Sequence, residues 1–197
     1  MKIYIDFDRT LFDCESYLND FYTIIKEYKI PKNVFIKYQN QCKRNGFNPD
    51  LILKGIFEEY KFDISIYEKI NDLLNNSKKY LYNDAIGFLK YLKTLNYQVI
   101  ILTKGNYDYQ KEKINNSKIN EFYNDLIIAM QHKGNLDIDY KESIFIDDNP
   151  IEIKSILKRK PKKVIRIKRK NSKYFDVKIN NIETVLSLNE IINNKLL

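Results

Sequence analysis

The sequence predicts an α/β protein with a doubly wound, Rossmann-like parallel sheet as its core and an all-helical domain inserted into that core. Short apolar runs of strand length alternate with segments whose apolar residues have helical spacing, as in doubly wound folds. Residues 14–80 interrupt the alternation, because they contain helical stripes without strand-like runs. With 197 residues and 44% hydrophobic content, the chain is long and apolar enough to bury such a core.

The expected strands are apolar runs bounded by polar residues. Most of their centres are continuous rather than alternating, which is typical of parallel strands buried on both faces. The last run is expected at an edge of the sheet, where flanking lysines protect against edge pairing. The five runs are Lys2 to Phe7, Gln98 to Thr103, Asp125 to Met130, Ser143 to Asp147 and Lys163 to Ile167.

Helices are expected between and after these strands. Asn83 to Leu95 places four apolar residues at helical spacing, and Tyr107 to Ser117 predicts a more polar helix. Pro150 suits the first turn of a further helix. Apolar residues at helical spacing between Ile182 and Leu197 predict a closing helix that packs on the core.

The insert contains four apolar stripes at helical spacing. The expected breaks between its helices are Pro31, Pro49 and the Asn75–Ser77 stretch. Because the insert follows the first strand directly, we expect it to lie over the carboxyl end of that strand. The predicted domains are a core made of residues 1–13 and 81–197 and a helical domain made of residues 14–80.

The composition excludes several kinds of catalytic site. One histidine, His132, and two cysteines, Cys14 and Cys42, lack the close ligand spacing of a zinc site. The few glycines form neither a dinucleotide-binding motif nor a P-loop. The first residues contain no apolar stretch long enough for a signal peptide or a membrane span. We therefore expect a cytoplasmic protein with reduced thiols and no membrane partner.

Polar side chains gather where the expected strands end. In a parallel sheet, ligands bind beyond the carboxyl ends of the strands, so these side chains are the candidates for a functional site. They supply four carboxylates and a hydroxyl, with lysines beside them. In chain order they are Asp6 and Asp8, Thr103 and Lys104, Lys133, and Asp147 and Asp148.

The order of these residues resembles the motif set of the haloacid dehalogenase (HAD) superfamily. The motifs of that family are an apolar strand ending in DxDxT, a second strand ending in Ser or Thr, a lysine, and an acidic pair after a further strand. The corresponding residues here are Asp6-Phe7-Asp8-Arg9-Thr10, Thr103, Lys133 and Asp147-Asp148. The insert is similar to the family's helical cap in its C1 position, between the first and second motifs. The resemblance implies a HAD-like phosphatase.

By this resemblance, Asp6 is the nucleophile and forms an aspartyl-phosphate that water then hydrolyses. Asp8 is the general acid and base that handles the proton of the leaving group. Dehalogenases of this fold need no such acid, so Asp8 resembles the phosphatases and phosphomutases. Thr103 and Lys133 complete the catalytic set, and the substrate phosphate is bound by Thr103, Lys104 and Lys133.

The same resemblance assigns a magnesium site to the acidic residues. Two like unit charges about 4 Å apart repel by about 4 kcal/mol at an effective dielectric constant of about 20, so carboxylates and a phosphate need cations between them. Mg²⁺ prefers oxygen ligands. The expected ligands are Asp6, the backbone carbonyl of Asp8, Asp147 and Asp148, with Lys133 as a second positive charge.

The match to the family motifs is open at two positions. Lys133 is favoured as the family's lysine because it follows the third strand directly, but Lys104 and Lys141 are alternatives. Arg9 stands where many members have a glycine after DxD, so the turn there is not expected to need a positive φ.

The chain carries 34 Lys and Arg against 26 Asp and Glu, a net charge of +8, and residues 158–170 are strongly basic. We expect this segment to form solvated turns around an edge strand. The alternative is a patch that binds the phosphates of nucleic acid.

The leading functional hypothesis is a Mg²⁺-dependent phosphomonoesterase for a small phosphorylated metabolite, with no nucleic-acid partner. One alternative is a phosphomutase or phosphotransferase of the same superfamily. Another is a nucleic-acid-binding protein or nucleic-acid-end phosphatase that uses the basic segment.

Overall fold

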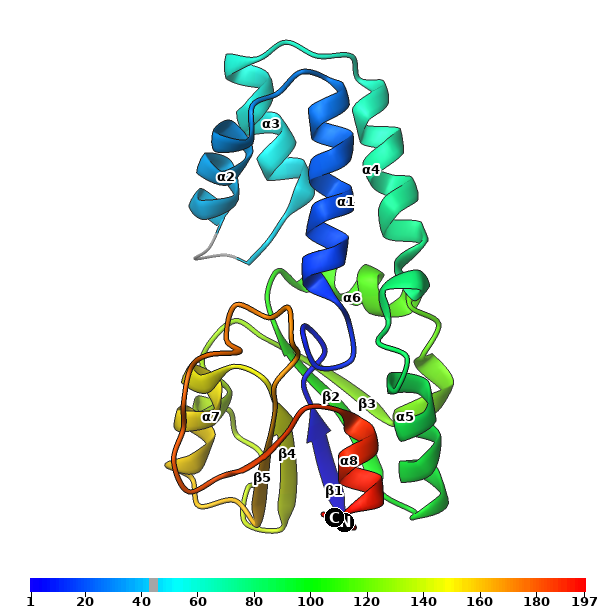
Figure 1. Ribbon diagram of the computed structural model, residues 1–197, viewed down its shortest axis with the longest axis vertical. Coiled ribbons are helices and arrows are strands. Elements are labelled where there is room, and N and C mark those ends of the chain that lie inside the picture. The colour runs from blue at the N-terminus through cyan, green and yellow to red at the C-terminus, as the bar shows by residue number, and fades with distance from the viewer. Residues whose placement is uncertain (43–45) are drawn as a thin grey trace.

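The core of the fold is a parallel sheet with helices on both faces, and further helices lie beyond one end of it (Figure 1). The computed structural model describes residues 1–42 and 46–197 of the chain. Within those residues, six parallel strands form one sheet in the order β3-β2-β1-β4-β5-β6. The strands are β1 (Lys2–Ile5), β2 (Gln98–Lys104), β3 (Asp125–Ala129), β4 (Ser143–Asp147), β5 (Lys163–Ile167) and β6 (Glu183–Val185).

Apolar residues of the strands alternate between the two faces of the sheet. Ile3 and Ile5 of β1 belong to one core cluster, whereas Tyr4 between them belongs to another. Tyr4 stacks on Phe145 of β4, with ring centroids 4.8 Å apart. The sheet is therefore buried on both faces, which explains why the apolar runs are continuous.

Helices from the part of the chain after residue 80 cover both faces of the sheet. On the face of Ile3, α5 (Ala85–Thr94) packs beside α8 (Leu188–Asn193). On the face of Tyr4, α7 (Pro150–Leu157) contributes two buried isoleucines to the core. This arrangement confirms the doubly wound α/β class that the alternation of strands and helices predicts.

Helices from residues 14–42 and 46–75 form a separate group beyond the carboxyl end of β1 (Figure 1). These helices are α1 (Cys14–Glu27), α2 (Lys32–Gln41), α3 (Pro49–Glu59) and α4 (Ser65–Asn75). Asp13 caps α1 by accepting a hydrogen bond from the backbone nitrogen of Ser16, and Asn48 caps α3 in the same way. The apolar faces of this group join the core cluster that also contains α5 and α8.

Gly46 brings the loop before α3 against the core. Its φ is +82°, and a Cβ atom at this position would come within 2.3 Å of the backbone nitrogen of Asn106. A side chain here would push the loop away from the residues that follow β2. Glycine at this position therefore keeps the helical group close to the carboxyl ends of the strands.

The prediction that Lys163 to Ile167 forms an edge strand is wrong. β6 pairs in parallel with β5, with Val185 opposite Ile167, so β5 is an interior strand. The expected closing helix between Ile182 and Leu197 is correspondingly shorter, because Ser187 caps α8 just before Leu188. A three-residue strand next to a six-residue helix is too short to show its own periodicity, so the two merge into one helical pattern in the sequence.

Residues 158–160 of the basic segment are exposed, as expected, but two of its arginines are buried. Arg166 is buried, and its two terminal nitrogens donate to the carbonyls of Val177 and Tyr174 at 2.6 and 2.8 Å. Arg169 is buried as well and donates to the Asp84 carboxylate and the Thr10 carbonyl. Protein acceptors take hydrogen bonds from the terminal nitrogens of both guanidinium groups, which offsets the cost of their burial, whereas the Nε of each has no partner among the described residues. The two guanidinium groups serve the interior of the protein rather than its surface.

The described helices are short. The longest of them, α1, has 14 residues, whereas a membrane span needs about 20 apolar residues. No helix in residues 1–42 and 46–197 combines the length and the apolar character of a membrane span. Cys14 and Cys42 are both buried and form no disulfide.

Candidate active site

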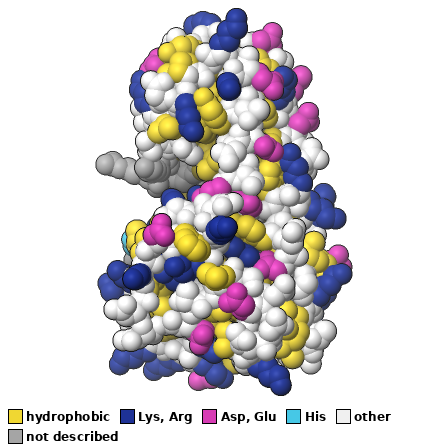
Figure 2. Space-filling model, viewed as in Figure 1, with side chains coloured by type: hydrophobic (Ala, Val, Ile, Leu, Met, Phe, Trp, Pro, Cys, Tyr) yellow, Lys and Arg dark blue, Asp and Glu magenta, His cyan; other side chains and the backbone are white. Residues whose placement is uncertain are grey.

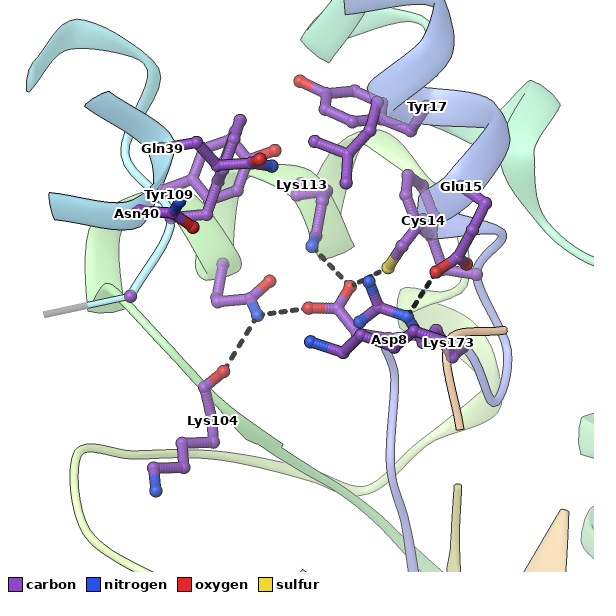
Figure 3. A pocket seen from close by; sticks show the side chains of 16 residues that line it. Asp8, Cys14, Glu15, Tyr17, Gln39, Asn40, Lys104, Tyr109, Lys113 and Lys173 are labelled. Carbon is purple, nitrogen blue, oxygen red and sulfur yellow. Dashed lines mark hydrogen bonds and ion pairs between the residues drawn. The ribbon is translucent and has the colours of Figure 1, made fainter. Parts of the chain in front are cut away.

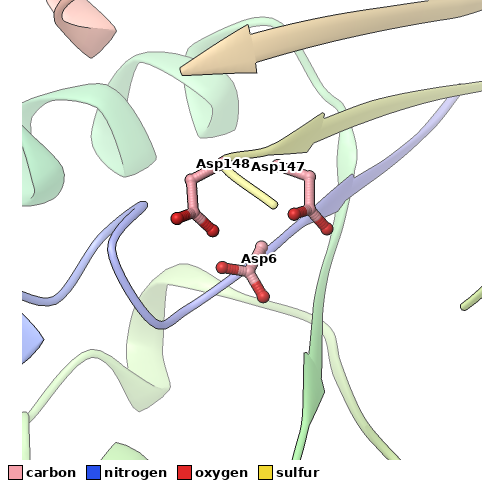
Figure 4. Close-up of side chains that lie close together, drawn as sticks. All are labelled: Asp6, Asp147 and Asp148. Carbon is pink, nitrogen blue, oxygen red and sulfur yellow. The ribbon is translucent and has the colours of Figure 1, made fainter. Parts of the chain in front are cut away.

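The carboxyl end of β1 lies where the strand order reverses, with β2 on one side and β4 on the other. Asp6 follows β1 directly, and its backbone nitrogen donates to the carbonyl of Ile146 in β4 at 2.9 Å. Asp147 ends β4, and Asp148 follows it. Adjacent strand ends therefore bring three carboxylates together, as Figure 4 shows. Such a reversal is where open α/β sheets bind their ligands.

Lys133 lies between two of these carboxylates. It belongs to a short 3₁₀ helix, η4 (Lys133–Asn135), and its Nζ is 2.6 Å from Asp6 Oδ1 and 2.6 Å from Asp147 Oδ2. Burial alone lowers the pKa of this lysine, but Asp147 and Asp6 outweigh that effect and raise it. Lys133 is therefore a charged, buried ammonium beside the candidate nucleophile.

Glu152 of α7 holds the backbone of Lys133. Its Oε2 accepts a hydrogen bond from the Lys133 backbone nitrogen at 2.8 Å. Its Oε1 accepts from Lys104 Nζ at 3.1 Å and lies 2.9 Å from His132 Nδ1. Burial raises the pKa of Glu152, but these donors outweigh it and lower the pKa overall.

These contacts distinguish the three lysines that could be the motif lysine. Lys133 contacts Asp6 and Asp147, and Lys104 is paired with Glu152. Lys141 is exposed and lines a different cavity, next to Tyr140. Of these three lysines, Lys133 is the one that contacts the strand-end carboxylates.

The acidic cluster of Asp6, Asp147 and Asp148 has the properties of a cation site. One oxygen from each residue lies within 4.8 Å of the others, and all three side chains are buried. Asp6 Oδ2 is buried with no hydrogen-bond partner among the described residues. Asp147 uses both oxygens on Lys133 and the Asn149 backbone, whereas Ser172 Oγ is 3.5 Å from Asp148 Oδ2.

The pKa values of the cluster indicate that burial, together with mutual repulsion, disfavours its charged form. Burial raises the pKa of Asp6 to about 7, against the opposing effect of Lys133. Burial, Asp6 and Asp147 together raise the pKa of Asp148 well above its usual value. A divalent cation relieves such repulsion, and an all-oxygen ligand set suits Mg²⁺. The residues present therefore fit a magnesium ion, with Asp6 and Asp148 offering the oxygens that are least engaged with protein donors.

Asp8 is held from both sides by residues that follow β2. Lys113 Nζ lies 2.5 Å from Asp8 Oδ1, and Gln110 Nε2 donates to Asp8 Oδ2 at 2.7 Å. Cys14 Sγ donates to Oδ1 at 3.1 Å. Burial by itself raises the pKa of Asp8, but Lys113 and the two other donors outweigh it and lower the pKa to about 2. Asp8 is therefore ionised at neutral pH.

Thr103 and Arg9 flank these carboxylates. Thr103 is fully buried near the end of β2, with its Oγ1 3.4 Å from Gln110 Nε2. Arg9 has φ of 62°, so the turn adopts the left-handed region although it was not expected to need a positive φ. The Arg9 guanidinium donates to Glu15 Oε1 at 2.6 Å, and this ion pair anchors the strained turn to the start of α1.

Two cavities meet at Asp8. A small one of about 100 Å³ is lined by Asp6, Asp8, Thr103, Lys133 and Asp148, among others. A larger one of about 520 Å³ extends from Asp8 between α1, the α2–α3 loop and the start of α6 (Tyr107–Asn116) (Figure 3). The wall of the larger cavity includes the side chains of Gln39, Asn40, Tyr109 and Lys113. Asp8 thus lies on the boundary between a compartment beside Asp6 and a wider compartment below the helical group.

Sequence reasoning missed several residues of the site. Gln110 and Lys113 are one turn apart on α6, and a polar helix directly after a site strand was the available signal. Glu152 lies in the first turn of α7, three residues after Asn149. Tyr174, which lines the small cavity, comes from a loop that no local pattern connects to the site.

Comparison with known proteins agrees with this geometry. The family model described as haloacid dehalogenase-like hydrolase matches residues 3–164. The chain is similar to the structure of a protein from Burkholderia xenovorans LB400 assigned as a haloacid dehalogenase-like hydrolase. The TM-score is 0.78 at 16% identity, and the similarity covers 99% of this chain and 97% of that one.

Two further solved structures have the same fold. YfnB from Bacillus subtilis, assigned as a HAD-hydrolase and solved bound to magnesium, has a TM-score of 0.63 at 12% identity, over 98% of this chain and 97% of its own. L-2-haloacid dehalogenase from Xanthobacter autotrophicus has a TM-score of 0.64 at 16% identity, over 99% of this chain and 98% of its own. No curated protein sequence matches the chain. The matched family model, the doubly wound sheet and the strand-end carboxylates together show that this chain is a member of the haloacid dehalogenase-like hydrolase family.

Proposed function

We propose that this hydrolase is a Mg²⁺-dependent phosphomonoesterase that acts through an aspartyl-phosphate on Asp6. The observation that carries the proposal is the position of Asp8 between the two cavities. The compartment beside Asp6 holds roughly three water molecules by volume, enough for a phosphate group but not for a whole metabolite. The rest of the substrate then occupies the larger compartment, and Asp8 faces the oxygen that joins the two parts.

In the first half of the reaction, an Asp6 oxygen attacks phosphorus while the bond to the leaving oxygen breaks. The leaving oxygen takes a proton from Asp8. Asp8 is ionised in the free protein, but an entering phosphate adds negative charge beside it and raises its pKa. In the second half, Asp8 accepts a proton from water, the water oxygen attacks phosphorus, and the Asp6 carboxylate and inorganic phosphate are released.

The positive groups in this site oppose the crowding of negative charge. Lys133 neutralises Asp6 and Asp147 and is positioned to contact a phosphate oxygen. Thr103, in the wall of the same cavity, supplies a further donor. Mg²⁺, when bound by the acidic cluster, supplies charge neutralisation and orients the phosphate.

Asp8 also favours a phosphatase over a dehalogenase. Halide needs no proton to leave, so a dehalogenase gains nothing from a carboxyl group that faces the leaving group. The described structure fixes Asp8 with Lys113 and Gln110 at just this boundary. The substrate that we propose is a small phosphorylated metabolite in the cytoplasm. Arg166 and Arg169 of the basic segment bond to the protein itself and are therefore not available to nucleic acid. On the face shown in Figure 2, Lys and Arg side chains are interspersed with Asp and Glu.

The test is an activity screen with p-nitrophenyl phosphate and a panel of phosphorylated sugars, nucleotides and amino acids, in Mg²⁺ and in EDTA. Activity is expected with Mg²⁺ and lost in EDTA. Asp6→Asn and Asp8→Asn should each abolish kcat, whereas Asp139→Asn, at an exposed position, should not. An Asp6→Asn variant with undiminished kcat contradicts the aspartyl-phosphate. Transfer of the phosphoryl group to a second substrate instead of water identifies a phosphomutase.

A further inference from the structure

Lys113 is a buried residue that contacts Asp8, and no part of the motif set accounts for it. It lies on α6, 105 residues away from Asp8 in sequence, and its side chain is 4% exposed. The Asp8 side chain is 24% exposed, so it faces both the buried ammonium and the open cavity (Figure 3). Lys113 lines the larger cavity, and its largely buried ammonium reaches Asp8 from the wall of that cavity.

Aromatic rings enclose the Lys113 ammonium. Its Nζ lies 5.5 Å from the ring centroid of Phe7, 5.0 Å from that of Phe12 and 5.2 Å from that of Tyr109. A buried ammonium is costly unless it is paired, and the faces of aromatic rings offset only part of that cost. The Asp8 carboxylate is its ion-pair partner. The pair is thus fixed in one geometry, unlike an exposed salt bridge between two mobile side chains.

Gln110 also fixes the position of the Asp8 carboxylate. Residues three apart lie on the same face of a helix, so Gln110 and Lys113 reach the two oxygens of one carboxylate. Gln110 Nε2 is also 3.2 Å from the carbonyl oxygen of Lys104, which ties it to the end of β2. The orientation of Asp8 is therefore set by α6 and β2, and not by its own turn alone.

We propose that Lys113 is a positioning residue that holds the Asp8 carboxylate at the boundary of the two cavities, where it meets the leaving oxygen. This inference rests on the proposed function. Without Lys113, the Asp8 side chain is free to turn toward the open cavity and water. The step that should slow most is the departure of a leaving group that needs a proton, because Asp8 can protonate the leaving oxygen only from a fixed position.

The kinetic test compares glycerol 3-phosphate, whose alkoxide needs a proton to leave, with p-nitrophenyl phosphate, whose phenolate does not. In Lys113→Met, kcat/KM for glycerol 3-phosphate should fall by about 10²-fold or more, as for loss of general acid–base catalysis. For p-nitrophenyl phosphate it should fall by less than about 10-fold, because kcat/KM reports the first half of the reaction. Lys111→Met, on the exposed side of α6, is the matched control and should change neither value.

A merely structural role for Lys113 predicts equal losses for both phosphates, and that result overturns the inference, as does full activity of Lys113→Met on glycerol 3-phosphate. If Lys113→Met does not yield folded protein, Lys113→Gln keeps an N–H donor without the charge. It should show the same difference between the two phosphates.

A crystal structure of the same variant separates this inference from the proposed function. Asp8 should have left its present position and its hydrogen bond to Gln110 in Lys113→Met. If the wild-type protein hydrolyses no phosphate but Asp8 is displaced in the variant, the proposed function fails and the positioning role stands. If the wild-type protein is an active phosphatase and Asp8 stays in place in the variant, the positioning role fails.

Discussion

Arg169 and Asp84 form a buried, two-pronged ion pair that joins the last third of the chain to both connections of the helical group. Two Arg169 nitrogens donate to the two Asp84 oxygens at 2.7 Å each, and one of them also donates to the Thr10 carbonyl at 2.7 Å. Thr10 lies on the connection from β1 to α1, and Asp84 directly precedes α5. The Arg169 guanidinium also lies 4.0 Å from the ring centroid of Tyr82.

Breaking this pair should destabilise the protein strongly. Arg169→Met leaves a buried carboxylate without its partner, which typically costs about 3–5 kcal/mol of unfolding free energy. Lys170→Met, at the exposed neighbouring position, should cost less than about 0.5 kcal/mol. Urea denaturation monitored by circular dichroism measures both variants. A loss below about 1 kcal/mol in Arg169→Met means that the pair is not stabilising.

Glu152 should matter for catalysis although it stands outside the family's motifs. Glu152→Ala removes the acceptor for the Lys133 backbone nitrogen and leaves that buried donor unsatisfied, which costs about 1–3 kcal/mol. Because Lys133 then loses its fixed place beside Asp6, kcat/KM should fall by about 10-fold or more, as when a residue that orients a ligand is lost. Glu142→Ala, at an exposed glutamate, is the control. Unchanged kinetics in Glu152→Ala would show that other contacts suffice to hold Lys133.

The acidic cluster predicts how stability depends on pH when no metal is bound. The pKa of Asp6 is raised from 3.8 to about 7, first by burial. A carboxyl group with a raised folded-state pKa stabilises the protein below its unfolded pKa and loses that contribution as the pH rises through its folded pKa. In EDTA, the melting temperature should therefore fall as the pH rises from about 4 to about 7.

Asp8 does not contribute to this change. Its pKa is lowered to about 2, so its contribution is present above the unfolded value of 3.8 and is lost only in stronger acid. Mg²⁺ should raise the melting temperature and flatten its pH dependence, because a cation stabilises the ionised cluster; a hundred-fold excess over Kd stabilises by about 2.7 kcal/mol. Asp148→Asn should lose most of the Mg²⁺ effect. A pH-independent melting temperature in EDTA would contradict the raised pKa of Asp6.

The chain sequence by itself determined the fold class and the strand-terminal residues of the site. Parallel strands end at one edge of a sheet, so the residues after β1, β2 and β4 had to converge wherever the strands paired. Asp6, Thr103 and Asp147 were predictable for that reason, and the family motifs added Lys133. The apolar runs predicted the burial of the sheet because their period is a local property of the chain.

Tertiary structure alone decided which distant side chains meet. Lys113 and Asp8 are 105 residues apart, and Arg169 and Asp84 are 85 apart. A polar residue on a helix gives no local sign that its charge will be buried, since that depends on which carboxylate the fold brings to it. The same holds for β6 and α8, which are too short to express their own periodicity. The physical reason is that the periodicity of apolar residues determines which face of a helix or strand a side chain occupies, whereas the packing of the elements determines which distant side chain it contacts.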